Sequence, residues 1–256
     1  MKFSSSGGER GQAVARIDDL LDQALRSVGD KPDDTAQASI KKRYSERISE
    51  AVAAAIAEEL RQRGLAGARP APPGVIGDSG AERRMAGGIG AKKVDVTWAT
   101  EESGLLLGIS VKTINFRDKK SGNFQKNLTN RRGDMLIEAV TLHRRFPYSV
   151  LAGLLFLDKD AETDHTAQRR STFENAHLRL KLFAGRDDPA GRDEQFERFF
   201  LLLLDAGAAH SSLRAFAVGD KDNQVPMEQV IDQLIEIVAV RNPDFYLYEG
   251  GQLGKL

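Results

Sequence analysis

Asp95 and Lys112 are the residues of this chain whose types and spacing best suit chemistry. Asp95 lies in a segment over 92–100 that is typical of a β-strand, and Lys112 lies in a second such segment over 105–116. A short turn at 101–104 predicts that the two strands form a hairpin. A carboxylate on one strand and a lysine on its partner form the skeleton of a metal-dependent phosphodiesterase site. The carboxylate binds a divalent cation, and the lysine orients the attacking water or stabilises developing charge.

Ser110 stands two residues before Lys112, so both side chains leave the same face of their strand. Asp95 can reach that face from the neighbouring strand of the hairpin. We therefore expect the three side chains to lie close together. A plainer interpretation is that Asp95 and Lys112 form a cross-strand ion pair at the edge of a sheet.

The elements that must position these residues alternate between helices and strands. A continuous apolar run over 148–157 predicts a central buried strand. The order of elements predicts an α/β fold in which helices flank a mixed central sheet. Helices are predicted over 13–28, 35–63, 127–145, 171–183 and 226–241, a further strand over 212–218, and either a strand or a helix over 195–205.

Composition divides the chain into three parts. Residues 1–64 form an N-terminal helical region, residues 65–80 a linker rich in proline and glycine, and residues 81–256 the main domain. The chain has no cysteine, which excludes a disulfide framework and a thiolate zinc site. It has no run of eighteen apolar residues and no apolar stretch at its N-terminus. We therefore expect a cytoplasmic protein without a membrane partner.

Basic residues gather around the Asp95–Lys112 hairpin. The net charge of the chain is zero, but the segment 83–132 holds eleven basic and four acidic residues. Such a local positive charge suits a protein that neutralises phosphates, although a solvated loop around 117–120 would also be basic. The candidate nucleic-acid contacts are Arg117, Lys119, Lys120, Lys126, Arg131 and Arg132.

Over roughly residues 82–160 the chain resembles the PD-(D/E)xK nuclease superfamily, which includes most type II restriction endonucleases. Val94-Asp95 stands where that superfamily has Pro-Asp, and Ser110-Val-Lys112 stands where it has Asp/Glu-x-Lys. The order of hairpin, helix and buried strand also matches. The resemblance implies a restriction-endonuclease-like fold and a DNA endonuclease that uses Mg²⁺, with Mn²⁺ as a substitute. It also implies a homodimer acting against foreign DNA.

Serine at the position of the second acid is a departure from that pattern. It is similar to a subgroup of restriction enzymes that carry Ser-x-Lys and take the missing carboxylate from the following helix. The corresponding helix of this chain offers Asp134 and Glu138, which are four residues apart and so share one face. The resemblance implies that Asp95 and one of these two hold the metal, with Lys112 assisting the water and Ser110 beside it.

Two other functions remain open. A nuclease-fold module with a disabled site would also lack the second acid. Such a module would bind nucleic acid or scaffold a defence complex. A structural α/β protein without a nucleic-acid role is the third possibility. The N-terminal helices could form the dimer interface or contact a partner protein.

Overall fold

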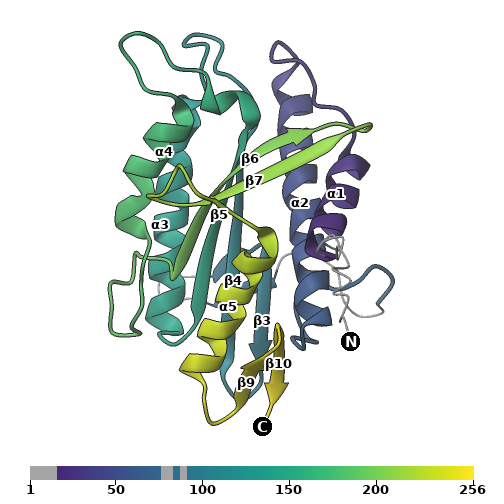
Figure 1. Ribbon diagram of the computed structural model, residues 1–256, viewed down its shortest axis with the longest axis vertical. Coiled ribbons are helices and arrows are strands. Elements are labelled where there is room, and N and C mark those ends of the chain that lie inside the picture. Colours follow the sequence, from purple (N-terminus) through teal and green to yellow (C-terminus); the bar gives the residue numbers. More distant parts are fainter. Residues whose placement is uncertain (1–15, 76–82, 87–90) are drawn as a thin grey trace, which may run out of the picture.

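A computed structural model describes residues 16–75, 83–86 and 91–256 of the chain. They form an α/β structure in which helices cover both faces of a mixed six-stranded sheet, which confirms the predicted fold class at this level (Figure 1). No helix in the described part of the chain has the length and apolar content that crossing a membrane requires.

The central sheet has the order β3-β4-β5-β6-β7-β8. β4, β5 and β6 run parallel to one another, and the remaining neighbours are antiparallel. All nine residues of β5 are buried, as its continuous apolar sequence predicts for a central strand. The strands are β3 (Val96–Thr100), β4 (Gly104–Ile114), β5 (Val150–Asp158), β6 (Arg198–Ala206), β7 (Ser211–Ala217) and β8 (Gln224–Val225).

Two small hairpins accompany the sheet in the described residues. One of them shows that the prediction of a single strand over 92–100 was wrong, because this segment forms two strands that separate at Asp95. Val94 pairs with the β1 strand, whereas Val96 pairs with Ile109 of β4. The hairpins are β1 (Arg83–Ala86) with β2 (Ala91–Val94), and β9 (Tyr246–Glu249) with β10 (Gln252–Lys255).

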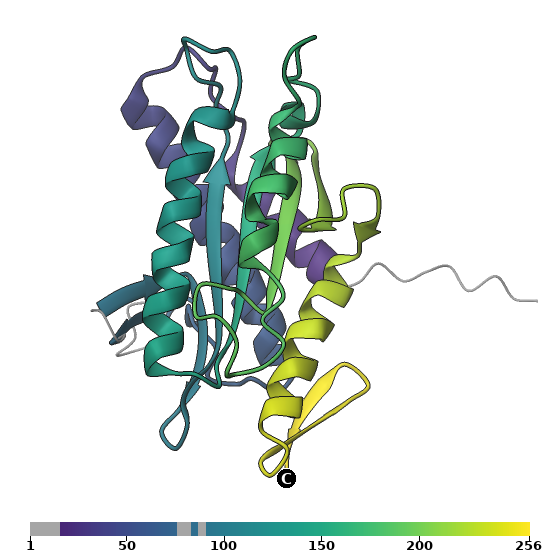
Figure 2. The ribbon, with the colours of Figure 1, turned by 90° about the vertical axis from the view of Figure 1, so that its left-hand side faces the viewer.

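Five α-helices in the described residues form two layers, and each was predicted within a few residues of its observed bounds. α1, α2 and α5 share a hydrophobic core with one face of the sheet, and α3 and α4 share a second core with the other. Figure 2 shows α3 and α4 in front of the sheet and α1 and α2 behind it. The helices are α1 (Arg16–Val28), α2 (Ala38–Gln62), α3 (Leu128–Arg145), α4 (Thr172–Leu180) and α5 (Met227–Arg241).

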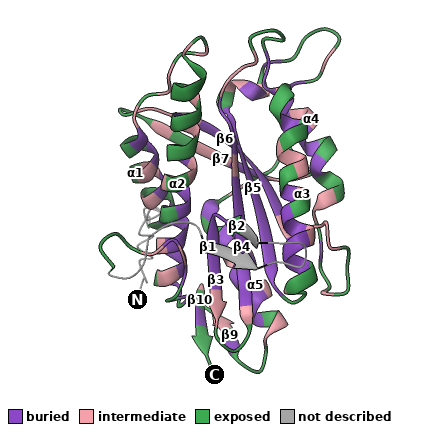
Figure 3. Ribbon diagram, turned by 180° about the vertical axis from the view of Figure 1, so that it is seen from behind, coloured by how far each residue is buried: buried purple, intermediate pink, exposed green. Residues whose placement is uncertain are grey.

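The two N-terminal helices are part of the core of the main domain. Leu21 of α1 and Ile48 of α2 belong to the same buried cluster as Ile109 of the sheet. The start of the predicted linker is also packed, because Arg69 exchanges backbone hydrogen bonds of 2.8 and 3.0 Å with Thr97 of β3. Residues 76–80 of that linker lie outside the described residues. Figure 3 shows the buried strands between helices whose outer surfaces are exposed.

Gly153 at the centre of β5 lets α3 pack close to this strand, which is the neighbour of β4. It pairs with Ser110 of β4. A Cβ atom here would lie 2.6 Å from the ring of Phe199 and 2.9 Å from the Cε atom of Met135 on α3. The absence of a side chain therefore fixes how closely α3 packs against the sheet.

We expect Gly153→Ala to lower the free energy of unfolding by about 1–3 kcal/mol, because the extra methyl overpacks this contact. Gly133→Ala is the matched control, since a Cβ on this α3 residue meets no atom within 4 Å. That change should raise stability by up to about 1 kcal/mol through its helix propensity. Urea denaturation of the two variants checks both signs, and equal effects would contradict the packing argument.

Candidate functional site

The carboxylate of Asp95 lies where β4 loses its antiparallel neighbour. The pairing of β3 with β4 reaches Val96 and Ile109, and β2 turns away toward β1. The backbone N–H of Val111 then donates a hydrogen bond of 2.6 Å to Oδ2 of Asp95. A side-chain oxygen thus takes the place of the carbonyl that a continuing strand would have supplied. This bond fixes Asp95 to the strand that carries Lys112.

Lys112 lies between two buried carboxylates. Its Nζ atom is 3.1 Å from Oδ2 of Asp95 and 3.6 Å from Oε2 of Glu138 on α3. Burial opposes the charge of the lysine, but the two carboxylates outweigh it and raise the pKa of Lys112. Burial, together with the negative charge of Asp95, raises the pKa of Glu138 to about 7 against the opposing effect of Lys112.

Ser110 adds a buried hydroxyl to this cluster. The residue is 1 % exposed, and its Oγ atom has no hydrogen-bond partner of normal geometry among the described residues. It lies close enough to the Glu138 carboxyl to oppose the rise in that group's pKa. A buried hydroxyl without a well-formed hydrogen bond is uncommon.

The structure separates the two carboxylates of α3 that the sequence left as alternatives. Glu138 is 6 % exposed and lies against the sheet, together with the buried Met135 and Ala139. Asp134 has a side chain that is 59 % exposed, and its ion pair is with Arg131 at 3.7 Å. Glu138 is therefore the helix carboxylate that joins Asp95 and Lys112.

The resulting donor set is small. No group of three or more His, Cys, Asp or Glu side chains that could hold a metal occurs in the described ranges. Asp95 and Glu138 nevertheless supply hard oxygen donors on either side of Lys112, and the unpaired hydroxyl of Ser110 lies with them. Mg²⁺ is commonly held by one or two carboxylates while it keeps several waters. The residues present fit such an ion.

Two residues of the cluster, Asp95 and Lys112, line a cleft of about 740 Å³, whereas Ser110 and Glu138 are not part of its lining. One wall is α2, and the other is the segment 116–131, which runs from the end of β4 into α3. The lining contains eight lysines and arginines and four acidic residues, so the cleft carries a net positive charge. The basic residues of the lining are Lys41, Lys42, Lys112, Arg117, Lys119, Lys120, Lys126 and Arg131.

The six predicted nucleic-acid contacts differ in their surroundings. Lys119 and Lys120 are exposed and have no ion pair within the described part of the chain. Lys126 pairs with Asp118 at 2.6 Å. Arg131 lines the cleft as well as pairing with Asp134.

The two remaining arginines make structural contacts. Arg117 lies 3.2 Å from the carboxylate of Asp160 and stacks on Phe124, with 4.9 Å between its guanidinium carbon and the ring centre. Arg132 is not part of the lining and lies over the ring of Phe183 at 5.9 Å. The cations with the fewest internal contacts are therefore Lys119 and Lys120.

Sequence reasoning missed the contribution of α2 to this cleft. Seven residues from 38 to 50, including Lys41 and Lys42, line it. The only signal was the polar side of an amphipathic helix, which every surface helix has. The position of that side became evident only once α2 was placed on the sheet.

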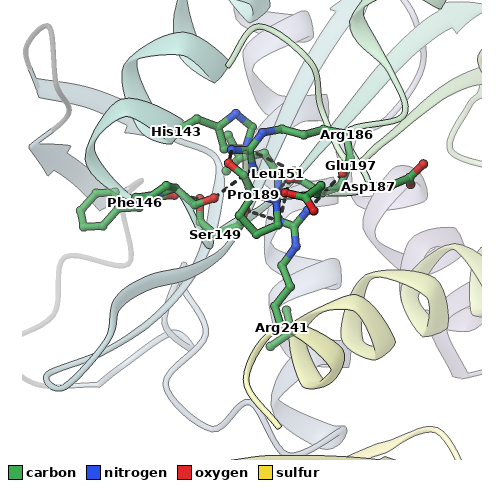
Figure 4. A network of polar contacts seen from close by, with 12 residues as sticks. His143, Phe146, Ser149, Leu151, Arg186, Asp187, Pro189, Glu197 and Arg241 are labelled. Carbon is green, nitrogen blue, oxygen red and sulfur yellow. Dashed lines mark hydrogen bonds and ion pairs between the residues drawn. The ribbon is translucent and has the colours of Figure 1, made fainter. Parts of the chain in front are cut away.

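Glu197 is the centre of a second buried polar cluster, at the start of β5 and β6 (Figure 4). Its carboxylate accepts hydrogen bonds from the backbone N–H of Leu151 at 2.6 Å, Arg241 at 2.7 Å and Arg186 at 3.0 Å. His143 lies 3.3 Å away through Nε2. Burial alone would raise the pKa of Glu197, but His143, Arg241 and the Leu151 amide outweigh it and lower the pKa.

This second cluster is structural. Arg186 and Arg241 also donate to backbone carbonyls of Pro147 and Ser149, which ties α5 and the segment before β6 to the loop that precedes β5. All four side chains are almost completely buried and line none of the clefts described. No sequence signal could have assembled residues so far apart in the chain.

Comparisons of the chain with protein-family models, with curated proteins and with solved structures gave no match.

We expect Glu197→Ala to destabilise the protein by about 3–5 kcal/mol, because two buried guanidinium groups would lose their counter-charge. Asp187→Ala is the control, since its 80 % exposed carboxylate pairs with Arg198 and contributes at most about 1 kcal/mol. Because the folded pKa of Glu197 lies below the ordinary 4.5, its contribution is complete above pH 4.5 and is lost as the pH falls through the folded value. Denaturation curves at pH 7 and below pH 4.5 measure both effects.

We expect Lys112→Met to destabilise the metal-free protein, and increasingly so as the pH rises from 6 to 8. Without the ammonium group, ionised Glu138 has no counter-charge, so its pKa rises above the present value of about 7. At pH 8 the loss should reach about 3 kcal/mol, and it should be smaller at pH 6, where the carboxyl is protonated. Urea denaturation in EDTA checks this against Lys119→Met, which changes an exposed lysine. A loss that does not depend on pH would show that Lys112 and Glu138 are not coupled.

Proposed function

We propose that the protein is a metal-dependent nuclease that hydrolyses phosphodiester bonds in DNA. The observation that carries the proposal is the convergence of Asp95, Lys112 and Glu138, with Asp95 and Lys112 lining a basic cleft. A lysine held between two carboxylates, beside an unpaired serine hydroxyl, combines the donor types that such hydrolysis needs. The restriction-like role against foreign DNA and the homodimer rest on the resemblance alone.

Asp95 and Glu138 would hold Mg²⁺, which would supply a Lewis acid for the phosphoryl oxygen and a more acidic bound water. The hydrogen bond from the Val111 amide orients the carboxylate of Asp95 for this role. Lys112 keeps its proton at neutral pH, because its pKa is raised. Its role is therefore to orient the attacking water and to stabilise charge on the phosphate.

The charge of the cleft supports a polyanionic substrate. Neutralisation of backbone phosphates by lysine and arginine drives nucleic-acid binding largely without regard to sequence. Eight basic side chains line the cleft against four acidic ones, and this excess of positive charge supports the binding of phosphates. Lys119 and Lys120 are exposed at the rim, where a phosphate can reach them without breaking an internal ion pair.

A binding module with a disabled site is the second candidate, and one observation favours it. Among the described residues two carboxylates meet at the site, and Lys112 pairs with both. The cleft would then retain its charge and bind nucleic acid without cleaving it. This candidate could also scaffold a defence complex. A partner protein that contacts the N-terminal helices stays a prediction for either candidate.

We expect the wild-type protein to cut supercoiled plasmid in Mg²⁺ or Mn²⁺, and Glu138→Gln to lower the rate by at least about 100-fold. The buried carboxylate cannot then hold the metal, whereas Asp134→Asn removes an exposed carboxylate one turn away and should leave the rate within about twofold. Gel electrophoresis of time courses at several metal concentrations gives the rates.

Two outcomes of this experiment would contradict the proposal. Loss of cutting in Asp134→Asn but not in Glu138→Gln would refute the assignment of the site. Absence of cutting by the wild type, with plasmid binding retained, would favour the binding module.

A further inference from the structure

α2 presents two different sides to the rest of the molecule. Its apolar side, with Ile48, Val52 and Ile56, is packed in the core shared with the sheet. Its polar side, with Lys42 and Ser49, faces the cleft above Lys112. The N-terminal helical region therefore contributes a surface to the candidate site as well as cover for the sheet.

Lys42 is the cation of this wall that is available to a ligand. Its side chain is 77 % exposed, and its ion pair with Glu46 is long, at 3.7 Å, and exposed. Such a pair contributes little and opens readily. Lys41 is more constrained, because its Nζ atom donates to the carbonyl of Asp34 at 3.0 Å and lies over the ring of Phe116.

The two walls are joined at one end of the cleft, which makes it a preformed feature. Arg117 donates through its backbone N–H to Oδ1 of Asp34 at 3.2 Å, just before α2 begins. Asn115 at the end of β4 donates to Oγ of Ser45 on α2 at 3.2 Å. A ligand in the cleft therefore meets basic residues on both walls, beside Lys112.

The positions of these lysines favour a nucleic-acid strand over a single phosphate as the ligand of the cleft. One phosphate would be held by donors that converge on a point. Here the available lysines belong to two separate elements, with Lys42 on α2 and both Lys119 and Lys120 on the opposite wall. A repeating anion that passes along the cleft can contact both walls at once.

We propose that α2 is one wall of a nucleic-acid groove. One sugar-phosphate backbone runs between α2 and the segment 116–131, with Lys42 contacting a phosphate across the groove from Lys119 and Lys120. The identity of the ligand rests on the proposed function, but the assignment of α2 does not require that the protein cleaves what it binds.

The test is the affinity for a fluorescently labelled DNA oligonucleotide, single-stranded and duplex, measured by anisotropy in EDTA at several salt concentrations. Lys42→Gln removes one phosphate contact, so it should weaken binding about 5–10-fold at 0.1 M salt and lower the salt slope by about one. Arg43→Gln is the matched control, because Arg43 is the next residue of α2, is exposed and does not line the cleft. It should leave both quantities unchanged. Lys119→Gln should behave like Lys42→Gln.

Three results would overturn the assignment. Equal losses in Lys42→Gln and Arg43→Gln would indicate only a general effect of surface charge. A loss in Lys119→Gln without one in Lys42→Gln would restrict the interface to the opposite wall. Absence of DNA binding by the wild type would remove both this inference and the proposed function. If the expected pattern of binding is found without plasmid cutting, the groove stands and the nuclease does not.

Discussion

The burial of the parallel strands on both faces is the constraint on which the rest of the structure depends. β4, β5 and β6 are buried along most of their length, and a sheet of this kind is stable only when helices cover each face. α3 and α4 cover one face. α5 covers part of the other, and the N-terminal helices α1 and α2 complete it. A helical region that composition separates from the main domain is thus required by the hydrophobic core of that domain.

The candidate site forms where β4 has no neighbouring strand on one side. β2 leaves the sheet at Asp95, so the edge of β4 beyond Ile109 faces a cleft in place of another strand. α2 and the start of α3 lie on the two sides of that gap, because each is fixed to its own face of the sheet. Side chains on the α3 side of β4 meet the buried face of that helix, which brings Lys112 to Glu138. The same packing that stabilises the sheet therefore positions the polar cluster.

The hairpin and the buried strand could be predicted, because alternation, turn residues and continuous apolar runs are local signals. Three features could not. Asp134 and Glu138 share a helix face by spacing, and only the packing of Met135 and Ala139 against the sheet shows that Glu138 is the inward residue. The break at Asp95 depends on a competition between two strand pairings. The place of α2 beside the cleft depends on contacts between segments about seventy residues apart, such as that of Ser45 with Asn115.

The two buried polar clusters differ in charge balance, and the difference bears on function. At Glu197, one carboxylate meets two arginines and a histidine, its pKa is lowered, and the cluster is closed. At Lys112, one ammonium group is shared by two carboxylates, and the pKa of Glu138 is raised to about 7. Ionised Glu138 is therefore poorly stabilised in this buried position, because buried charges stabilise only when they are compensated. An added divalent cation would stabilise the ionised carboxylate, and the basic cleft that Asp95 and Lys112 line would bring a phosphate to the same place.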